Sequence, residues 1–301
     1  MLQGQHNITG YAHETGSRSC TRYAIVCEVC TAIDGGEYVG EYIELPGVKT
    51  WYEVEGQGDP VLLLHGGFCT NETWGAQRAA FAANHRVFLP ERRAHGHTPD
   101  VEGRLSYYDM AKDTIDFLTS VVGSPAHLVG WSDGGIVALL VAIARADLVR
   151  KIAVTGANFK PASEISLAEG LDELTAEAPE LGMFRAMYEP ASPDGPQHWP
   201  TVVEKLVQMY RAEPDIPIED LGRISAPTLV LVGDDDIVTL EHTLELYRAI
   251  PNSELAVAPG TSHAHFVEKP SLVNRIILEF LDNDPVPTMM PVRRRTAPDS
   301  T

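Results

Sequence analysis

Cysteines, basic residues and long hydrophobic runs are all scarce in this chain of 301 residues. Four cysteines are too few, at this length, for a small fold held together by disulfides. The 23 Lys and Arg are outnumbered by 42 Asp and Glu, and the resulting net charge of −19 repels nucleic-acid phosphates and anionic membranes. No apolar run approaches the roughly 20 residues of a membrane-spanning helix. We therefore expect neither a nucleic-acid partner nor a membrane partner.

The remaining composition is that of a globular protein, with 44% hydrophobic and 22% charged residues. The length fits one large α/β domain or two small ones. The first residues carry no basic segment, and their longest apolar stretch, residues 23–27, is too short for a signal peptide. We expect a cytoplasmic protein.

The two ends of the chain differ from its centre. Residues 1–38 show no sustained hydrophobic period, and Cys27 and Cys30 have zinc-ligand spacing without a second pair at zinc-site distance. We expect this segment to be a poorly ordered extension, without metal. Residues 283–301 are rich in Pro, Met and Arg and predict a disordered tail.

Between these ends, strand and helix patterns alternate. Two strands, 41–45 and 49–54, flank a Pro-Gly turn and predict a hairpin. Continuous apolar strands follow at 61–64, 86–89, 126–129, 151–154, 227–232 and 254–257. Helical patterns occupy 72–83, 107–122, 134–146, 240–250 and 271–282. This alternation predicts an α/β fold with a doubly wound, mostly parallel sheet, formed by residues 39–157 and 224–282.

Residues 158–223 contain no convincing strand and predict an inserted helical lid. Their apolar side chains either pack against the main domain or contact a substrate, and both interpretations stay open. If they contact substrate, they predict an apolar or aromatic pocket, to which Trp131, outside this segment, also contributes. The candidate substrate-binding residues are Trp131, Met183, Phe184, Met187, Tyr188 and Trp199.

The strongest local signal is the segment Gly130-Trp131-Ser132-Asp133-Gly134-Gly135. It directly follows a predicted strand and precedes a predicted helix, which is the context of a nucleophile elbow. Small residues are needed on either side of the serine because the turn is sharp. Ser132 is therefore the candidate nucleophile.

A serine needs a base, and the base needs a carboxylate that orients it. Three consecutive aspartates, residues 234–236, follow a predicted strand at the edge of the sheet where sites form. A turn containing His263 and His265 follows the next strand. The order serine, acid, histidine is the one this architecture requires.

With these segments the sequence resembles the α/β-hydrolase superfamily over about residues 40–282. A strand runs into His65-Gly66-Gly67-Phe68, and the elbow, a Gly-Asp-x-Asp turn and a Gly-x-x-His turn follow in order. The resemblance implies a triad of Ser132, Asp236 and His263. Asp234 is the fallback for the acid and His265 a distant second for the base. The elbow is also similar to that of the biphenyl-hydrolase-like valacyclovirases, which cleave amino-acid esters.

The chemistry also requires backbone amides that face a developing oxyanion. One is the amide of Asp133, and the resemblance implies a second at Phe68, or alternatively at Gly67, while His65 braces the loop. A further hypothesis pairs the Asp133 carboxylate with a substrate ammonium group. The family usually has Asp at the position of Glu91 and Gly at that of Ala94, in a segment that is structural in most members.

These residues predict a cofactor-independent serine hydrolase that cleaves a carboxylic ester or lactone through an acyl-enzyme. A serine at the elbow argues against the haloalkane dehalogenase and epoxide hydrolase branches. Two alternatives stay open. One is a C–C bond hydrolase acting on a ring-fission diketone, for which Arg185 or Arg211 would anchor a carboxylate. The other is a non-catalytic ligand receptor. We expect no metal and no cofactor, and the assembly, monomer or homodimer, stays open.

Overall fold

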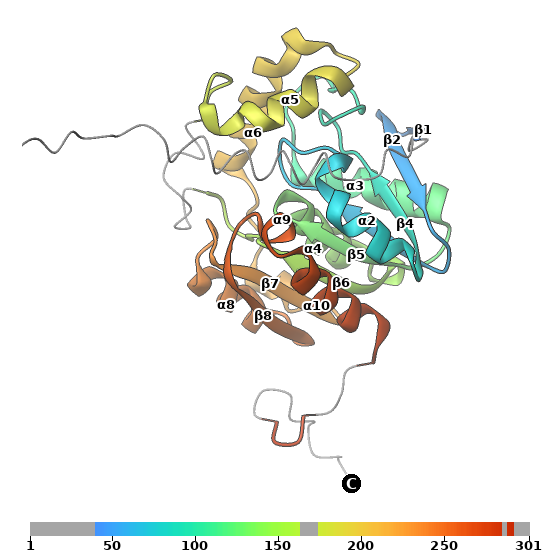
Figure 1. Ribbon diagram of the computed structural model, residues 1–301, viewed down its shortest axis with the longest axis vertical. Coiled ribbons are helices and arrows are strands. Elements are labelled where there is room, and N and C mark those ends of the chain that lie inside the picture. Colours follow the sequence, from blue (N-terminus) through green and yellow to red (C-terminus); the bar gives the residue numbers. More distant parts are fainter. Residues whose placement is uncertain (1–39, 163–173, 285–287, 292–301) are drawn as a thin grey trace, which may run out of the picture.

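The computed structural model describes residues 40–162, 174–284 and 288–291, so the whole predicted N-terminal extension, residues 1–38, lies outside it. Eight strands form one sheet in the order β1-β2-β4-β3-β5-β6-β7-β8 (Figure 1). The strands are β1 (Glu41–Leu45), β2 (Val48–Glu55), β3 (Asp59–Leu64), β4 (His85–Pro90), β5 (Ala126–Trp131), β6 (Val149–Thr155), β7 (Thr228–Asp235) and β8 (Ser253–Ser262). The hairpin strand β2 pairs antiparallel with β1 and β4, and all other pairs are parallel. The predicted fold class is confirmed.

Helices cover both faces of the sheet, and each face has its own hydrophobic core. One core contains side chains of α3 and α4, and the other contains side chains of α2, α9 and α10. The helices outside the insertion are α2 (Gly75–Ala82), α3 (Tyr107–Phe117), α4 (Asp133–Ala144), α8 (Leu240–Ala249), α9 (His265–Glu268) and α10 (Pro270–Asp282). Helix α4 is buried through most of its length, as its almost wholly apolar sequence requires.

The sequence predicts one helix over residues 107–122, but the structure divides it. Helix α3 begins at its cap, Ser106, whose hydroxyl accepts a hydrogen bond from the amide of Tyr108. After Phe117 the chain makes a π-helical turn, η2 (Leu118–Val122), and Gly123 ends it at φ 70°. Glycine adopts this left-handed conformation without the steric penalty that a side chain carries.

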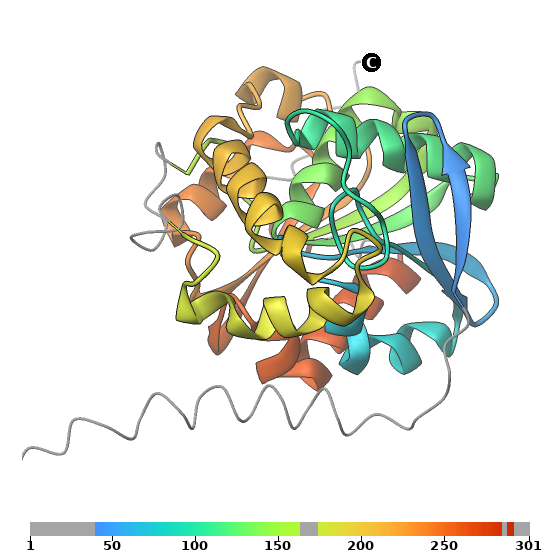
Figure 2. The same ribbon diagram turned by 90° about the horizontal axis from the view of Figure 1, so that it is seen from above.

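Helical segments fill the described part of the connection between β6 and β7. They are η5 (Pro179–Leu181), α5 (Gly182–Ala191), η6 (Pro196–His198), α6 (Trp199–Ala212) and α7 (Ile218–Leu221). In Figure 1, α5 and α6 stand above the sheet, and Figure 2 shows the same helices from above. We refer to residues 158–162 and 174–223 as the insertion. Residues 163–173 of the predicted lid lie outside the described part of the chain.

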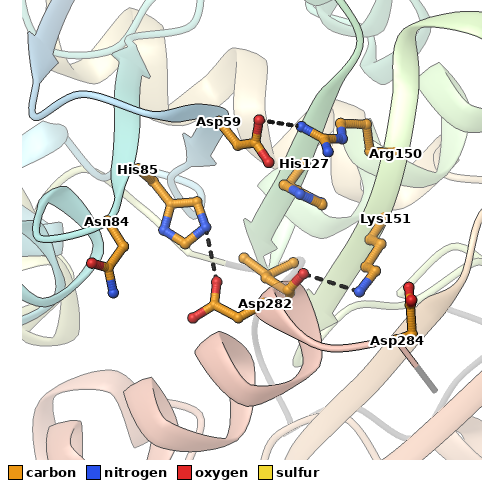
Figure 3. A pocket seen from close by; sticks show the side chains of 9 residues that line it. Asp59, Asn84, His85, His127, Arg150, Lys151, Asp282 and Asp284 are labelled. Atoms are coloured by element: carbon orange, nitrogen blue, oxygen red, sulfur yellow. Dashed lines mark hydrogen bonds and ion pairs between the residues drawn. The ribbon is translucent and has the colours of Figure 1, made fainter. Parts of the chain in front are cut away.

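The amino ends of the parallel strands carry a polar cavity of about 380 Å³ (Figure 3). Four of its charged side chains, Asp59, Arg150, Lys151 and Asp282, have partners. The Arg150 guanidinium lies 2.7 Å from the Asp59 carboxylate, and His85 Nε2 lies 3.0 Å from Asp282 Oδ1. Lys151 Nζ donates to three carbonyl groups at the end of α10. The contacts of His85 and Lys151 fasten the last helix to the sheet.

Within the described residues, no helix is both long and apolar enough to cross a membrane.

Candidate active site

Ser132 lies at the junction of β5 and α4, at φ 54° and ψ −120°. This is a strained conformation for any residue with a side chain. A methyl group on Gly130 would overlap the Gly134 carbonyl, and one on Gly134 would overlap the carbonyl that ends β3. The turn therefore needs glycine on both sides of the serine, as the sequence pattern predicts.

Asp236 and His263 meet beyond the ends of β7 and β8. His263 Nδ1 lies 2.7 Å from Asp236 Oδ1, and the Asp236 side chain is completely buried. Burial alone would raise the pKa of Asp236, but the hydrogen bond with His263 and the nearby imidazole charge hold it below its usual value. Gly156, at φ 56°, lets the backbone pass close to this pair, since a methyl group there would lie 2.9 Å from His263 Nδ1.

Neither fallback residue replaces Asp236 or His263 in their contact, although His265 Nδ1 lies 3.8 Å from Asp236 Oδ2. Asp234 is exposed and accepts a hydrogen bond from the Thr261 amide at 3.0 Å, so it fastens β7 to β8. His265 is fully buried, and its Nδ1 lies 3.2 Å from the Ser262 carbonyl oxygen. Burial and the neighbouring His263 lower the pKa of His265 to about 4. Neither side chain lines the cavity described below.

Residues 65–69, which we call the oxyanion loop, follow β3 and lie beside Ser132. A methyl group on Gly66 would lie 3.5 Å from Ser132 Cβ, and Phe68 adopts φ 61°. His65 is buried, its Nδ1 lies 2.8 Å from the Gly66 carbonyl oxygen, and its Nε2 accepts from the Arg92 amide at 3.2 Å. His65 therefore braces the loop and does not face the cavity.

An apolar cavity of about 310 Å³ opens over Ser132. Its described walls come from the oxyanion loop, the elbow, the insertion and the turns after β7 and β8. The lining residues are Gly66, Gly67, Phe68, Cys69, Trp131, Ser132, Leu174, Glu180, Leu181, Phe184, Tyr210, Ile237 and His263. No motif in the sequence marks Cys69, Glu180 or Ile237 as cavity residues.

Of the six candidate substrate-binding residues, Trp131 and Phe184 line this cavity. Met183 and Met187 are half-buried and Tyr188 and Trp199 buried, but none of the four is among the described lining residues. Trp199 packs behind Phe68, with ring centroids 5.9 Å apart, and Tyr188 packs on Trp199 at 5.3 Å. These two aromatic side chains support the wall from behind.

The side chain of Asp133 is buried outside the cavity. Its Oδ1 accepts from the Tyr107 hydroxyl at 2.8 Å and its Oδ2 from the Tyr210 hydroxyl at 3.2 Å. Burial raises the pKa of this carboxyl group, whereas the Arg92 charge and the two hydroxyls lower it. Both carboxylate oxygens already have a hydroxyl donor and the side chain is not among the described lining residues, so the structure argues against the amine-recognition hypothesis.

Cys69 also carries a nucleophilic side chain among the described lining residues. It is buried, and burial raises the pKa of its thiol far above the usual value. A protonated thiol is a poor nucleophile. Ser132 therefore remains the better candidate.

The segment that departs from the family pattern has a structural role here. The Glu91 carboxylate is buried and accepts from the amides of Asn71 at 3.0 Å and His97 at 2.6 Å. Ala94 sits at φ 64°, a conformation that glycine adopts more readily. Among residues 40–162, 174–284 and 288–291, no group of three or more His, Cys, Asp or Glu side chains is placed to hold a metal ion.

A mostly parallel eight-stranded sheet covered by helices, with an elbow after β5, defines the class of α/β-hydrolase folds. Comparison with known proteins then gives the family. The chain belongs to the alpha/beta hydrolase family, which matches residues 61–276.

Two curated relatives illustrate the range of similar proteins. The serine hydrolase BPHL of Homo sapiens is 26% identical over 255 residues, which cover 79% of this chain and 85% of that protein. The pimeloyl-[acyl-carrier protein] methyl ester esterase of Nitrosospira multiformis is 24% identical over 261 residues, which cover 77% of this chain and 98% of that protein.

Solved structures agree on the fold. The meta-cleavage product hydrolase of Pseudomonas fluorescens IP01 superposes with a TM-score of 0.68 at 23% identity, over 81% of this chain and 98% of that one. A thermophilic esterase from Thermogutta terrifontis superposes with a TM-score of 0.62 at 27% identity, over 82% of this chain and 98% of that one.

Proposed function

We propose that this protein is a cofactor-independent serine hydrolase that cleaves carboxylic esters or lactones. The observation that carries the proposal is the contact between His263 and the buried Asp236 carboxylate, at the wall of the cavity that holds Ser132. The strain at Ser132 supports it, because strained backbone concentrates at functional sites.

In the proposed reaction, Ser132 Oγ attacks the substrate carbonyl carbon and its proton passes to His263 Nε2. The backbone amides of Asp133 and of Phe68 or Gly67 donate to the oxyanion. The bond to the leaving oxygen then breaks, and that oxygen takes the proton from His263. A water molecule gives a proton to His263 and attacks the acyl carbon. The bond from that carbon to Ser132 Oγ then breaks, Oγ takes the proton back from His263, and the acid is released. Asp236 holds the imidazole with Nδ1 protonated throughout.

The apolar cavity favours an ester or lactone over the anionic diketone of a ring-fission C–C hydrolase. Among the described lining residues there is no lysine or arginine that would bind a carboxylate. Arg185 is half-exposed and pairs with Glu189 at 2.7 Å, and Arg211 lines other surface depressions. Neither arginine that the sequence offered as an anchor lines the cavity.

The position of the insertion supports its predicted role as a lid. Leu181 and Phe184, near the start of α5, form part of the cavity wall, and Tyr210 contributes from α6. We propose that these side chains determine which acyl groups fit.

The test is hydrolysis of a panel of p-nitrophenyl acyl esters and homoserine lactones by the wild type, Ser132→Ala and Glu180→Gln. We expect wild-type turnover, a loss of at least about 10³-fold in Ser132→Ala, and retention of most activity in Glu180→Gln. Turnover that survives in Ser132→Ala would refute the serine mechanism. A wild type that cleaves no ester or lactone but cleaves a ring-fission diketone would replace the proposal with the C–C hydrolase, and one that cleaves neither would favour the receptor.

A further inference from the structure

A buried carboxylate lies directly behind the oxyanion loop, and the proposed reaction does not use it. Asp133 contributes its amide to the proposed oxyanion hole, but its side chain bonds to Tyr107 of α3 and Tyr210 of α6. All three side chains are at most 6% exposed. Because each carboxylate oxygen has its own hydroxyl donor, the carboxylate is fixed in position.

The Asp133 carboxylate and the Tyr210 hydroxyl pack directly against Gly67. A methyl group on Gly67 would overlap the Tyr210 hydroxyl and lie 2.7 Å from Asp133 Oδ2. The hydroxyl and the carboxylate therefore occupy the space that a side chain at residue 67 would fill. Any displacement of either group changes the support of the oxyanion loop at the residue that is, with Phe68, a candidate amide donor.

A buried cation holds the same loop through its carbonyl groups. The Arg92 guanidinium donates to the carbonyl of His65 and, at 3.0 Å, to that of Gly66. Arg92 is 5% exposed; burial raises the pKa of Asp133, and the Arg92 charge opposes that rise. The loop is thus held at its carbonyl groups by Arg92 and at Gly67 by the Asp133 carboxylate with its two tyrosine hydroxyls.

A negative charge beside an oxyanion hole would by itself oppose the charge that develops in the transition state. Two groups of donors offset this effect. The Tyr107 and Tyr210 hydroxyls donate to the carboxylate, and the nearby Arg92 guanidinium, bound to the carbonyl groups of the loop, interacts favourably with its charge. The remaining effect of the carboxylate is to hold the oxyanion loop in a fixed position, and small displacements of catalytic groups lower the reaction rate strongly.

We propose that Asp133 is a positioning residue whose carboxylate, held by Tyr107 and Tyr210, fixes the oxyanion loop and makes its geometry depend on helix α6 of the insertion. This inference rests on the proposed ester hydrolysis. It assigns the residue after the serine a role in supporting the loop, and it gives the insertion a second task besides enclosing the substrate.

The test compares Tyr107→Phe and Tyr210→Phe with Tyr108→Phe. Each variant loses one hydroxyl and keeps its ring, but the Tyr108 hydroxyl is exposed and donates to the Asp215 carbonyl at 3.2 Å, away from the loop. For the best ester of the panel, we expect kcat to fall by about 10- to 100-fold in the first two variants, with KM changed less than about threefold. We expect Tyr108→Phe to match the wild type.

A transition-state analogue separates positioning from a loss of stability. A trifluoromethyl ketone forms an oxyanion on the enzyme, so its affinity should fall by the same factor as kcat/KM in Tyr107→Phe and Tyr210→Phe. Asp133→Asn keeps the backbone amide, and adding Tyr210→Phe to it should cause less than about a twofold further loss, because both changes remove the same support. Circular dichroism at the assay temperature confirms that each variant is folded.

The outcomes distinguish this inference from the proposed function. Folded tyrosine variants with wild-type kcat and wild-type affinity for the ketone refute the positioning role while leaving the hydrolase intact. Independent, multiplicative losses in the Asp133→Asn and Tyr210→Phe combination refute it as well. A wild type that hydrolyses no ester and does not bind the ketone refutes the proposed function and this inference together.

Discussion

Replacing Ser132 by glycine should make the protein more stable than replacing it by alanine. At φ 54° and ψ −120°, a residue with a Cβ atom is strained, and such strain typically costs about 1–3 kcal/mol. Alanine keeps the Cβ atom and the strain, whereas glycine relieves it. Glycine also loses about 0.5–1 kcal/mol more backbone entropy on folding. The expected net gain of Ser132→Gly over Ser132→Ala is therefore about 1 kcal/mol.

Urea unfolding followed by circular dichroism measures this difference. Both variants lack the nucleophile, so they form a matched pair in which only the Cβ atom differs. We expect a higher midpoint for Ser132→Gly at an unchanged slope, and a melting temperature higher by about 2–4 °C. An equal or lower stability of the glycine variant would show that the elbow is not strained, and it would remove one support of the proposed site.

Three further predictions follow from the structure. Gly67→Ala introduces a methyl group into the space of a tyrosine hydroxyl and should lower kcat/KM by at least about tenfold, whereas Gly182→Ala, which meets nothing within 4 Å, should not. Glu180 is the one carboxylate among the described lining residues of the cavity. Glu180→Gln should therefore reduce the preference for cationic over isosteric neutral acyl esters by about 2–5-fold. Glu177 is not among those lining residues, so Glu177→Gln should leave this preference unchanged. Burial lowers the pKa of His127 to about 4 from 6.5, so between these two pH values the unfolded chain binds more protons than the folded chain, and stability is lost as the pH falls from about 6.5 to 4. His127→Gln should therefore reduce the slope of the unfolding free energy against pH, measured by urea unfolding, by up to about 1.4 kcal/mol per pH unit. An unchanged slope would contradict the assignment.

Much of the fold can be predicted from local patterns, because each buried strand is a short apolar run with turn residues at its ends. The hairpin turn at Pro46-Gly47 and the strand before the elbow are examples, and the structure places both within one or two residues of the prediction. Strand β8 is longer than its apolar run, residues 254–257, because it continues to pair with β7 past an irregularity after Gly233. Such an extension depends on the partner strand and has no signal in the strand itself.

Some residues of the candidate site can likewise be predicted from local patterns, and others cannot. Motifs with fixed spacing point to Ser132, Asp236 and His263, and the structure places Asp236 and His263 in contact and His263 and Ser132 at one cavity. The support of the oxyanion loop has no such signal, since Tyr107 and Tyr210 come from helices far apart in the sequence. The cavity wall is equally hard to predict, because it depends on how the insertion packs over the sheet.

Mass-spectrometric mapping of a fluorophosphonate adduct tests the central claim most directly. The reagent reacts with an activated serine and leaves a covalent mark on it. We expect one modified peptide, which contains Ser132, in the folded wild type, and no adduct in Ser132→Ala or in the wild type unfolded in urea. An adduct on another residue, or ester turnover by a folded wild type whose Ser132 stays unmodified, would show that Ser132 is not the nucleophile.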